Sequence, residues 1–169
     1  SADDLFPFKE SLSKELDPVK FSLSFLQQPD LFIRVRPARV QQVMQKLNAS
    51  SIPFTEAGTY CLRLMKNTSV ESIVQPNREV VIQDYNSQRV FCFLDHNPAL
   101  LPVTNPITVW DCCAASGGKS ILLYDTLKGK IKLTVSDIRE SILSNLVKRM
   151  QEAGININRK FVCDLTTTK

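Results

Sequence analysis

The spacing of apolar residues divides the chain into two parts that differ in the order of their predicted strands and helices. In the first part, residues 31–36 and 59–65 alternate apolar and polar side chains, and this alternation predicts half-buried strands. Residues 78–84 predict a third strand. Pro37 suits the first turn of a helix that runs to residue 50, because Val40, Val43, Met44 and Leu47 then share one face.

The remaining segments of this first part predict short helices. The acidic opening predicts one or two helices broken at Asp17-Pro18, and residues 86–95 predict a bridging helix. We therefore expect residues 1–95 to form a small α+β domain. Its strand–helix–strand start with basic residues resembles RNA-recognition modules, although it has no aromatic-rich RNA-binding signature.

After a proline-rich linker over residues 96–106, apolar strands alternate with amphipathic helices. The expected strands cover residues 107–113, 131–137 and 160–164, and the helices between them close at Gly129 and Gly154. A βαβαβ order with short connections predicts a parallel sheet with right-handed crossovers. The expected fold class is thus α/β, with residues 107–169 forming the first half of a Rossmann-like sheet. Because such a sheet usually continues beyond three strands, we expect the chain to be a truncated part of a longer protein.

Composition narrows the functional classes. The 169 residues contain no apolar run of the roughly 18 residues that a membrane helix needs, and no signal peptide opens the chain. The five cysteines lack metal-ligand spacing, so we expect reduced thiols, no metal site and a cytoplasmic location. His96 is expected to be a loop residue. These features predict no membrane partner.

Charge is distributed unevenly along the first domain. Residues 31–66 carry six basic side chains against Glu56 alone, a net charge of +5, whereas residues 1–30 carry −3. This excess could attract the phosphate backbone of RNA or form a solvated face, and the sequence favours neither. The candidate RNA-binding residues are Arg34, Arg36, Arg39, Lys46, Arg63 and Lys66.

The stretch VWDCCAASGGKS, residues 109–120, resembles an ATP-binding loop at first sight. A phosphate loop requires G-x-x-x-x-G-K followed by Ser or Thr, and its first glycine allows the sharp turn around the phosphate. Cys113 occupies that glycine position. The sequence also lacks an obvious carboxylate for magnesium in a downstream apolar strand. A nucleotide hydrolase is therefore the weaker interpretation.

Three features at strand ends favour an adenosyl ligand instead. The pair Gly117-Gly118 follows the first strand of the second part, Asp137 ends the second strand about 20 residues later, and Asp164 ends the third. Open α/β sheets bind ligands at this edge, where an acid at that distance reaches ribose hydroxyls. Asp111 could brace the turn. Each feature also has a structural interpretation: a tight turn, a helix cap and the start of a turn.

These residues carry a resemblance to a known family. The string DCCAASGGKS, residues 111–120, resembles D-x-C-A-A-P-G-G-K followed by Thr or Ser, the first motif of the Sun/Fmu-type RNA cytosine-5 methyltransferases, and departs from it at Ser116. Residues 81–90 resemble the family's V-Q-D-x-x-S-Q segment, and LFIRVRPARV resembles its I-R-V-N segment. The segments from Ser136 and from Phe161 resemble its second and third motifs.

The resemblance implies S-adenosylmethionine as cofactor and methylation of C5 of cytosine in ribosomal or transfer RNA. Asp137 would bind the ribose hydroxyls and Asp164 would lie beside the adenine. The methionine end would contact the loop residues Cys113, Ala114, Ala115, Ser116, Gly117, Gly118 and Lys119.

The family's reaction uses a cysteine thiolate that adds to C6 of cytosine, in a P-C-S-type motif, and a second cysteine in a T-C-type motif. Neither motif occurs in this sequence. No catalytic residue is assigned, and we expect the chain by itself to be inactive and to bind the cofactor weakly. The alternative is a non-catalytic RNA-binding module. We also expect self-association through the uncovered face and edge of the truncated sheet.

Overall fold

The computed structural model describes residues 2–95, 97 and 105–167. Contacts between Cα atoms group the chain into two compact units, Ser1–Asp30 and Leu31–Lys169. His96 and most of the expected linker lie outside the described residues, so the expected domain limits stay predictions. The expected α/β class is confirmed, because helices combine with one antiparallel and one parallel sheet.

The first unit is helical. It contains α1 (Ala2–Leu5), a 3-10 helix η1 (Lys9–Ser11) and α2 (Pro18–Ser24). The Asp17 carboxylate accepts hydrogen bonds from the backbone N–H groups of Val19 and Lys20 at 2.9 and 3.0 Å, and Pro18 occupies the first helical position. The predicted break at Asp17-Pro18 is therefore the start of a capped helix.

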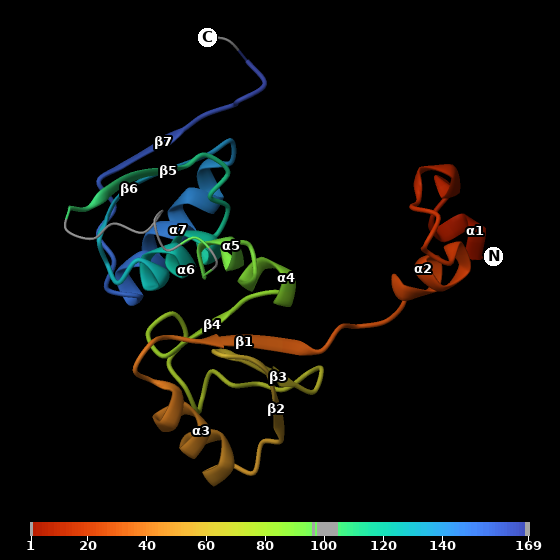
Figure 1. Cartoon of the computed structure of the whole chain (residues 1–169), viewed down its shortest axis with the longest axis horizontal. Coiled ribbons are helices and arrows are strands. Elements are labelled where there is room, and N and C mark those ends of the chain that lie inside the picture. The colour runs from red at the N-terminus through yellow and green to blue at the C-terminus, as the bar shows by residue number, and fades with distance from the viewer. Residues whose placement is uncertain (1, 96, 98–104, 168–169) are drawn as a thin grey trace. The chain divides into compact units, whose positions relative to one another are not determined.

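The second unit begins with an antiparallel sheet, shown in orange to green in Figure 1. Its strands are β1 (Leu31–Val35), β2 (Phe54–Gly58), β3 (Cys61–Leu64) and β4 (Val80–Ile82), in the order β2-β3-β1-β4. Helix α3 (Val40–Ala49) packs on this sheet through Val43 and Leu47, which are fully buried. The sequence pattern missed β2, because FTEAG does not alternate apolar and polar residues and its strand is largely exposed.

The expected bridging helix over residues 86–95 is wrong. The structure has two short helices instead, α4 (Tyr85–Gln88) and α5 (Cys92–Asp95). Asp84 caps α4 by accepting hydrogen bonds from Asn86 N and Ser87 N at 2.9 and 3.2 Å. The segment between the two helices begins with Arg89 and Val90, and the asparagine, serine, valine and phenylalanine around it have low helix propensity.

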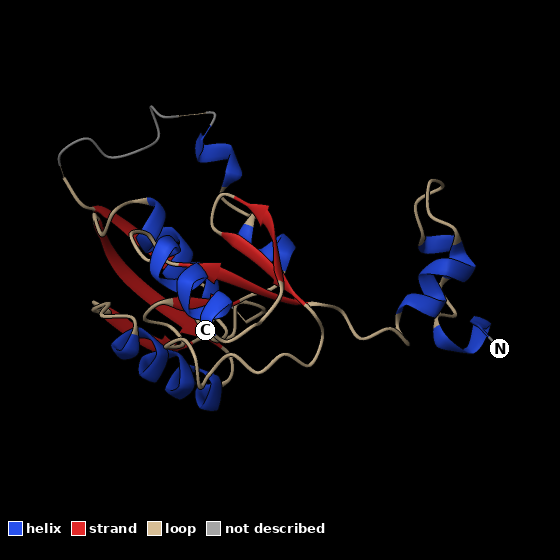
Figure 2. Ribbon diagram, turned by 90° about the horizontal axis from the view of Figure 1, so that it is seen from below, coloured by secondary structure: helices blue, strands red, loops and turns tan. Residues whose placement is uncertain are grey.

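The parallel sheet follows, with the βαβαβ order that the sequence predicts. Its strands β5 (Ile107–Asp111), β6 (Ile131–Asp137) and β7 (Arg159–Val162) pair in the order β5-β6-β7. Helices α6 (Gly118–Thr126) and α7 (Glu140–Glu152) cover one face of this sheet (Figure 2). The core between the helices and the sheet contains Ile121, Leu133, Val135, Leu143, Leu146 and Met150.

Candidate functional site

The loop that joins β5 to α6 contains most of the predicted cofactor residues. Asp111, the last residue of β5, accepts a hydrogen bond from the hydroxyl of buried Ser120 at 2.5 Å. Asp111 thus braces the loop, as expected, by accepting from a side chain of α6. Gly117 caps α6 in the left-handed conformation, with φ of 84°.

The structure explains Gly117 by packing. A Cβ atom at this position would lie 2.7 Å from Cε of Met150 and 3.1 Å from Cγ of Leu146, both on α7. The left-handed backbone also disfavours any side chain. At Gly118, by contrast, a Cβ atom would meet the Gln83 side chain at 3.6 Å, an ordinary contact. The fold therefore requires glycine at position 117 and not at position 118.

Two hydrogen bonds connect the loop to the end of β6. Ala114 N donates to the carbonyl of Ser136 at 3.0 Å, and Ala115 N donates to Oδ2 of Asp137 at 2.9 Å. Ala115 itself has a positive φ of 45°. The Asp137 carboxylate therefore lies directly against the glycine-containing loop, so the structure brings together the two features that the sequence placed at adjacent strand ends.

Asp137 also forms an ion pair with Arg139, a partner that the sequence analysis missed. Arg139 donates to Oδ1 of Asp137 from its backbone N at 3.1 Å and from its side-chain Nε at 3.0 Å. The side-chain and backbone donors of Arg139, with the N–H of Ala115, lower the pKa of Asp137 to about 2. The signal for this pair was the Asp-Ile-Arg triplet, since the carboxylate and guanidinium lie two residues apart at a strand end.

We expect Asp137→Asn to destabilise the chain by about 1 kcal/mol at pH 7. The value is modest because the Arg139 side chain is 57% exposed and the ion pair is screened by water. The lowered pKa contributes stability above the ordinary pKa of 3.8, and this contribution disappears as the pH falls from about 4 to about 2. Urea unfolding at several pH values measures the difference between variant and parent. A difference that stays constant down to pH 3 would contradict this assignment.

Asp164 lies near Asp137 at the same edge of the sheet. Cys163 N donates to the backbone carbonyl of Asp137 at 3.2 Å, so the pairing of β6 with β7 continues to this point. The Asp164 carboxylate accepts hydrogen bonds from N and Oγ1 of Thr166 at 2.9 and 2.7 Å, and these bonds lower its pKa. Asp164 therefore begins a turn, as the structural alternative predicted. It also lies at the edge of the sheet where the ligand is expected.

The outer side of the loop carries Cys113, Ser116 and Lys119, which are exposed. A further residue that sequence reasoning missed, Arg149 of α7, fixes this side. Its Nη1 donates to the carbonyl and the hydroxyl of Ser116 at 2.9 and 2.8 Å, and its Nε donates to Oδ1 of Asn77 at 2.9 Å. The loop is therefore tied to α7 and to the segment before β4.

The six candidate RNA-binding residues lie in two different environments. Arg34 of β1 and Arg36, the residue directly after β1, form ion pairs with Asp125 of α6, both at 2.7 Å, and their side chains are only 5% and 12% exposed. Lys46 pairs with buried Glu79 at 2.8 Å. The other three, Arg39, Arg63 and Lys66, are exposed.

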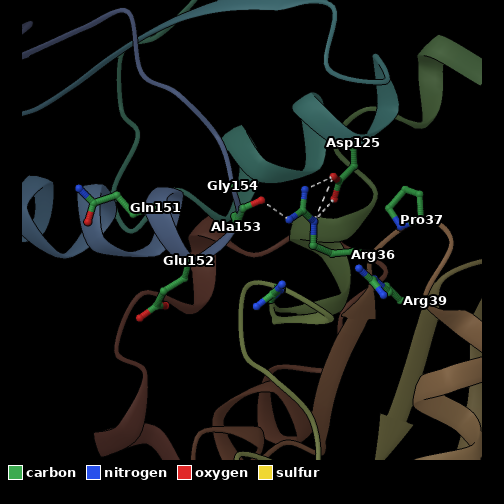
Figure 3. A pocket seen from close by; sticks show the side chains of 9 residues that line it. Arg36, Pro37, Arg39, Asp125, Gln151, Glu152, Ala153 and Gly154 are labelled. Atoms are coloured by element: carbon green, nitrogen blue, oxygen red, sulfur yellow. Dashed lines mark hydrogen bonds and ion pairs between the residues drawn. The ribbon is translucent and has the colours of Figure 1, made fainter.

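The Arg36 guanidinium joins the two sheets of the second unit. Figure 3 shows it between the Asp125 carboxylate and the end of α7, where it also donates to the carbonyl of Ala153 at 2.6 Å. In Figure 1, α6 and α7 lie between the antiparallel and the parallel sheet. Beside Arg36 is a cavity of about 570 Å³, whose basic lining also includes Arg39 and Arg78. This cavity contains none of the predicted cofactor residues.

The geometry can be compared with known proteins. The sequence of the chain matches no protein-family model and no curated protein. Its structure is similar to PH0851, with a TM-score of 0.70 and 22% identity over 92% of this chain and 34% of that protein. A methyltransferase homologue from Pyrococcus horikoshii gives a TM-score of 0.65 and 17% identity over 96% of this chain and 50% of that protein. NSun6 from Pyrococcus horikoshii, in a structure with SFG, gives a TM-score of 0.54 and 11% identity over 97% of this chain and 63% of that protein.

The chain shares the fold of these proteins. The resemblance to the Sun/Fmu-type family predicted from the sequence is thereby confirmed at the level of the fold, through a solved methyltransferase homologue and a solved NSun6. The chain spans between a third and just under two thirds of the length of these three structures. At this level of identity the likeness establishes the architecture, and activity has to be argued from the residues.

Two of the cysteine thiols have raised pKa values. Burial raises the pKa of the Cys61 thiol. Desolvation and the neighbouring Cys112 raise the pKa of the Cys113 thiol. Within residues 2–95, 97 and 105–167, no cluster of three His, Cys, Asp or Glu side chains could hold a metal ion, and no helix could cross a membrane.

Proposed function

We propose that this chain is the RNA-facing and cofactor-loop part of an S-adenosylmethionine-dependent methyltransferase that modifies C5 of cytosine in RNA. The observation that carries the proposal is the hydrogen bond from Ala115 N in the loop to Asp137 at the end of β6. It puts a carboxylate against a glycine-containing turn at the edge where open α/β sheets bind ligands. The fold shared with a methyltransferase homologue supports the same proposal.

The described residues fit an adenosyl cofactor at this edge. The cofactor supplies the methyl group. In the proposal, the loop from Cys113 to Lys119 holds its methionine end, Asp137 accepts hydrogen bonds from ribose hydroxyls, and Asp164 lies beside the adenine. Arg139 now occupies one side of Asp137, and its half-exposed side chain is free to turn toward solvent when a hydroxyl takes its place. The start of α6, where backbone N–H groups have no partner within the helix, is the expected position of the carboxylate at the methionine end.

RNA is the proposed partner of the antiparallel sheet and α3, which would form the RNA-recognition-like domain, with the parallel sheet as the first half of a Rossmann-like domain. We assign phosphate contacts to the exposed residues Arg39, Arg63 and Lys66. The roles of Arg34, Arg36 and Lys46 would be indirect, because their charges are paired with carboxylates. Ribosomal or transfer RNA as substrate and a cytoplasmic location stay predictions.

The face of the parallel sheet opposite α6 and α7, which no described helix covers, supports the expected self-association. Trp110 and Phe161 lie on this face, 52% and 39% exposed, with their rings 6.0 Å apart. We propose that copies of the chain associate through it. Sedimentation of the chain as a monomer at high concentration would contradict this.

The function is tested with labelled S-adenosylmethionine and an unmodified RNA transcript, using both the whole protein and the 169-residue chain. We expect the whole protein to label C5 of cytosine and the chain alone to transfer nothing, because its sequence contains neither cysteine motif of the family. We expect Asp137→Ala in the whole protein to raise the KM for the cofactor at least tenfold. Labelling of another base, or magnesium-dependent ATP hydrolysis without methyl transfer, would overturn the proposal.

A further inference from the structure

A second cavity is lined by residues from the antiparallel sheet and from α6, and by none of the predicted cofactor residues. Its walls come from the turn between β2 and β3, from α4 and the residues after it, and from the outer side of α6. Its volume is about 570 Å³. Sites that bind small molecules have volumes of about 300 to 1,000 Å³.

One wall contains a buried guanidinium with an unused donor. Arg34 lines the cavity and is 4% exposed. Its Nε donates to Oε1 of Gln83 at 3.1 Å, and its Nη1 donates to Oδ2 of Asp125 at 2.7 Å. Its Nη2 has no hydrogen-bond partner among the described residues. A buried donor without an acceptor is costly, so this position favours an incoming oxygen atom.

The charge around the cavity also favours an electron-rich ligand. Arg34 and Arg36 share the single carboxylate of Asp125, which leaves one buried positive charge without a counterpart in this cluster. Asp125 is the only carboxylate among the lining residues of the cavity, and Arg89 and Lys128 add two cations at its exposed rim. The Arg89 guanidinium lies 5.5 Å from the centre of the Tyr85 ring, and this contact holds it at the wall.

An aromatic ring is available for stacking. Tyr60, at the turn between β2 and β3, lines the cavity and is 46% exposed. Among the described residues, its ring packs against no other aromatic ring. The Tyr85 ring, in contrast, lies between Phe32 and Arg89. A flat ligand that enters the cavity can therefore stack on Tyr60.

We propose that this cavity binds one unpaired nucleotide of RNA. The base stacks on Tyr60, a carbonyl oxygen on the base accepts the free N–H of Arg34, and the phosphate lies at the rim beside Arg89 and Lys128. The proposal rests on the proposed function only in naming RNA as the source of the nucleotide. The carbonyl requirement makes the site selective, because cytosine, uracil and guanine carry such an oxygen and adenine does not.

The test is titration of the 169-residue chain with free cytidine 5′-monophosphate, followed by calorimetry or by NMR shifts, and it needs no methyl transfer. We expect saturable binding of cytidine 5′-monophosphate with a dissociation constant below about 10 mM. Adenosine 5′-monophosphate, which lacks the carbonyl, and ribose 5-phosphate, which lacks the base, should each bind at least fivefold more weakly. A short single-stranded cytidine oligonucleotide should compete with the free nucleotide. Failure of any one of these results would overturn the proposal, even if the whole protein methylates RNA.

Matched variants locate the binding. Tyr60→Ala should weaken binding about tenfold, whereas Tyr60→Phe keeps the ring and should stay within twofold of the parent. Arg89→Gln should weaken binding severalfold, whereas Arg159→Gln makes the same change of charge on β7 outside the cavity and should not. All three residues are exposed, so these variants should fold. Equal effects of Arg89→Gln and Arg159→Gln would show a general charge effect and would overturn the assignment to this cavity.

Discussion

Replacing Asp125 by Asn is expected to destabilise the second unit by about 3–5 kcal/mol. The Asp125 carboxylate binds Arg34 through one oxygen and Arg36 through both, and the three side chains are at most 12% exposed. Without the carboxylate, two guanidinium charges would stay buried with only neutral acceptors. Because a buried charge without its counterion is far more costly than a lost surface ion pair, the midpoint of urea unfolding should fall sharply.

Asp84→Asn is the matched control for this variant. It makes the same chemical change at an exposed position, where the side chain caps α4 through Asn86 N and Ser87 N. Asparagine caps helices about as well as aspartate, so the control should stay within about 0.5 kcal/mol of the parent. If the two variants unfolded at similar urea concentrations, Asp125 would not be the counterion that joins β1 to α6.

The same ion pairs show where sequence reasoning about this chain fails. Arg34 in β1 and Arg36 directly after it alternate with apolar residues, so the pattern predicted the strand correctly and placed the arginines on its polar face. It could not reveal that α6 covers this face and supplies Asp125 from 89 residues further along the chain. A strand pattern identifies which side chains share a face, but not what packs against each face. The expected RNA surface therefore included two residues that are internal.

The parallel sheet was more predictable, because its signals are local. The spacing of apolar residues, which changes between strands and helices, and the short connections specified the order of strands and helices. Asp137 and Asp164 lie at the carboxyl ends of parallel strands, which meet at one edge of the sheet. Arg139 and Arg149 escaped prediction for different reasons. Arg139 lies two residues after Asp137, but the sequence does not show whether its side chain turns toward this carboxylate or toward solvent. Arg149 reaches Ser116 across 33 residues, and only the packing of α7 brings the two together.

Gly117 and Gly118 are expected to differ in how strongly an added methyl group lowers the stability of the second unit. Gly117→Ala should destabilise the second unit by about 3 kcal/mol, because two costs add. The left-handed conformation at φ of 84° disfavours a side chain by about 1–2 kcal/mol, and the new methyl group would overlap Met150 and crowd Leu146 in the core. The Met150 atom is Cε, the end of a flexible side chain that can shift, so most of the packing cost comes from Cγ of fully buried Leu146, 3.1 Å away.

Gly118→Ala adds the same methyl group one residue later and should leave stability within about 1 kcal/mol of the parent, because alanine favours the helix and the nearest atom is 3.6 Å away. Urea unfolding of the two variants separates a glycine that the fold requires from one that it does not. The new methyl group meets the side chain of Gln83, so Gly118→Ala in the whole protein should raise the KM for S-adenosylmethionine less than Asp137→Ala does. A KM raised as far as in Asp137→Ala would contradict this placement of the methyl group.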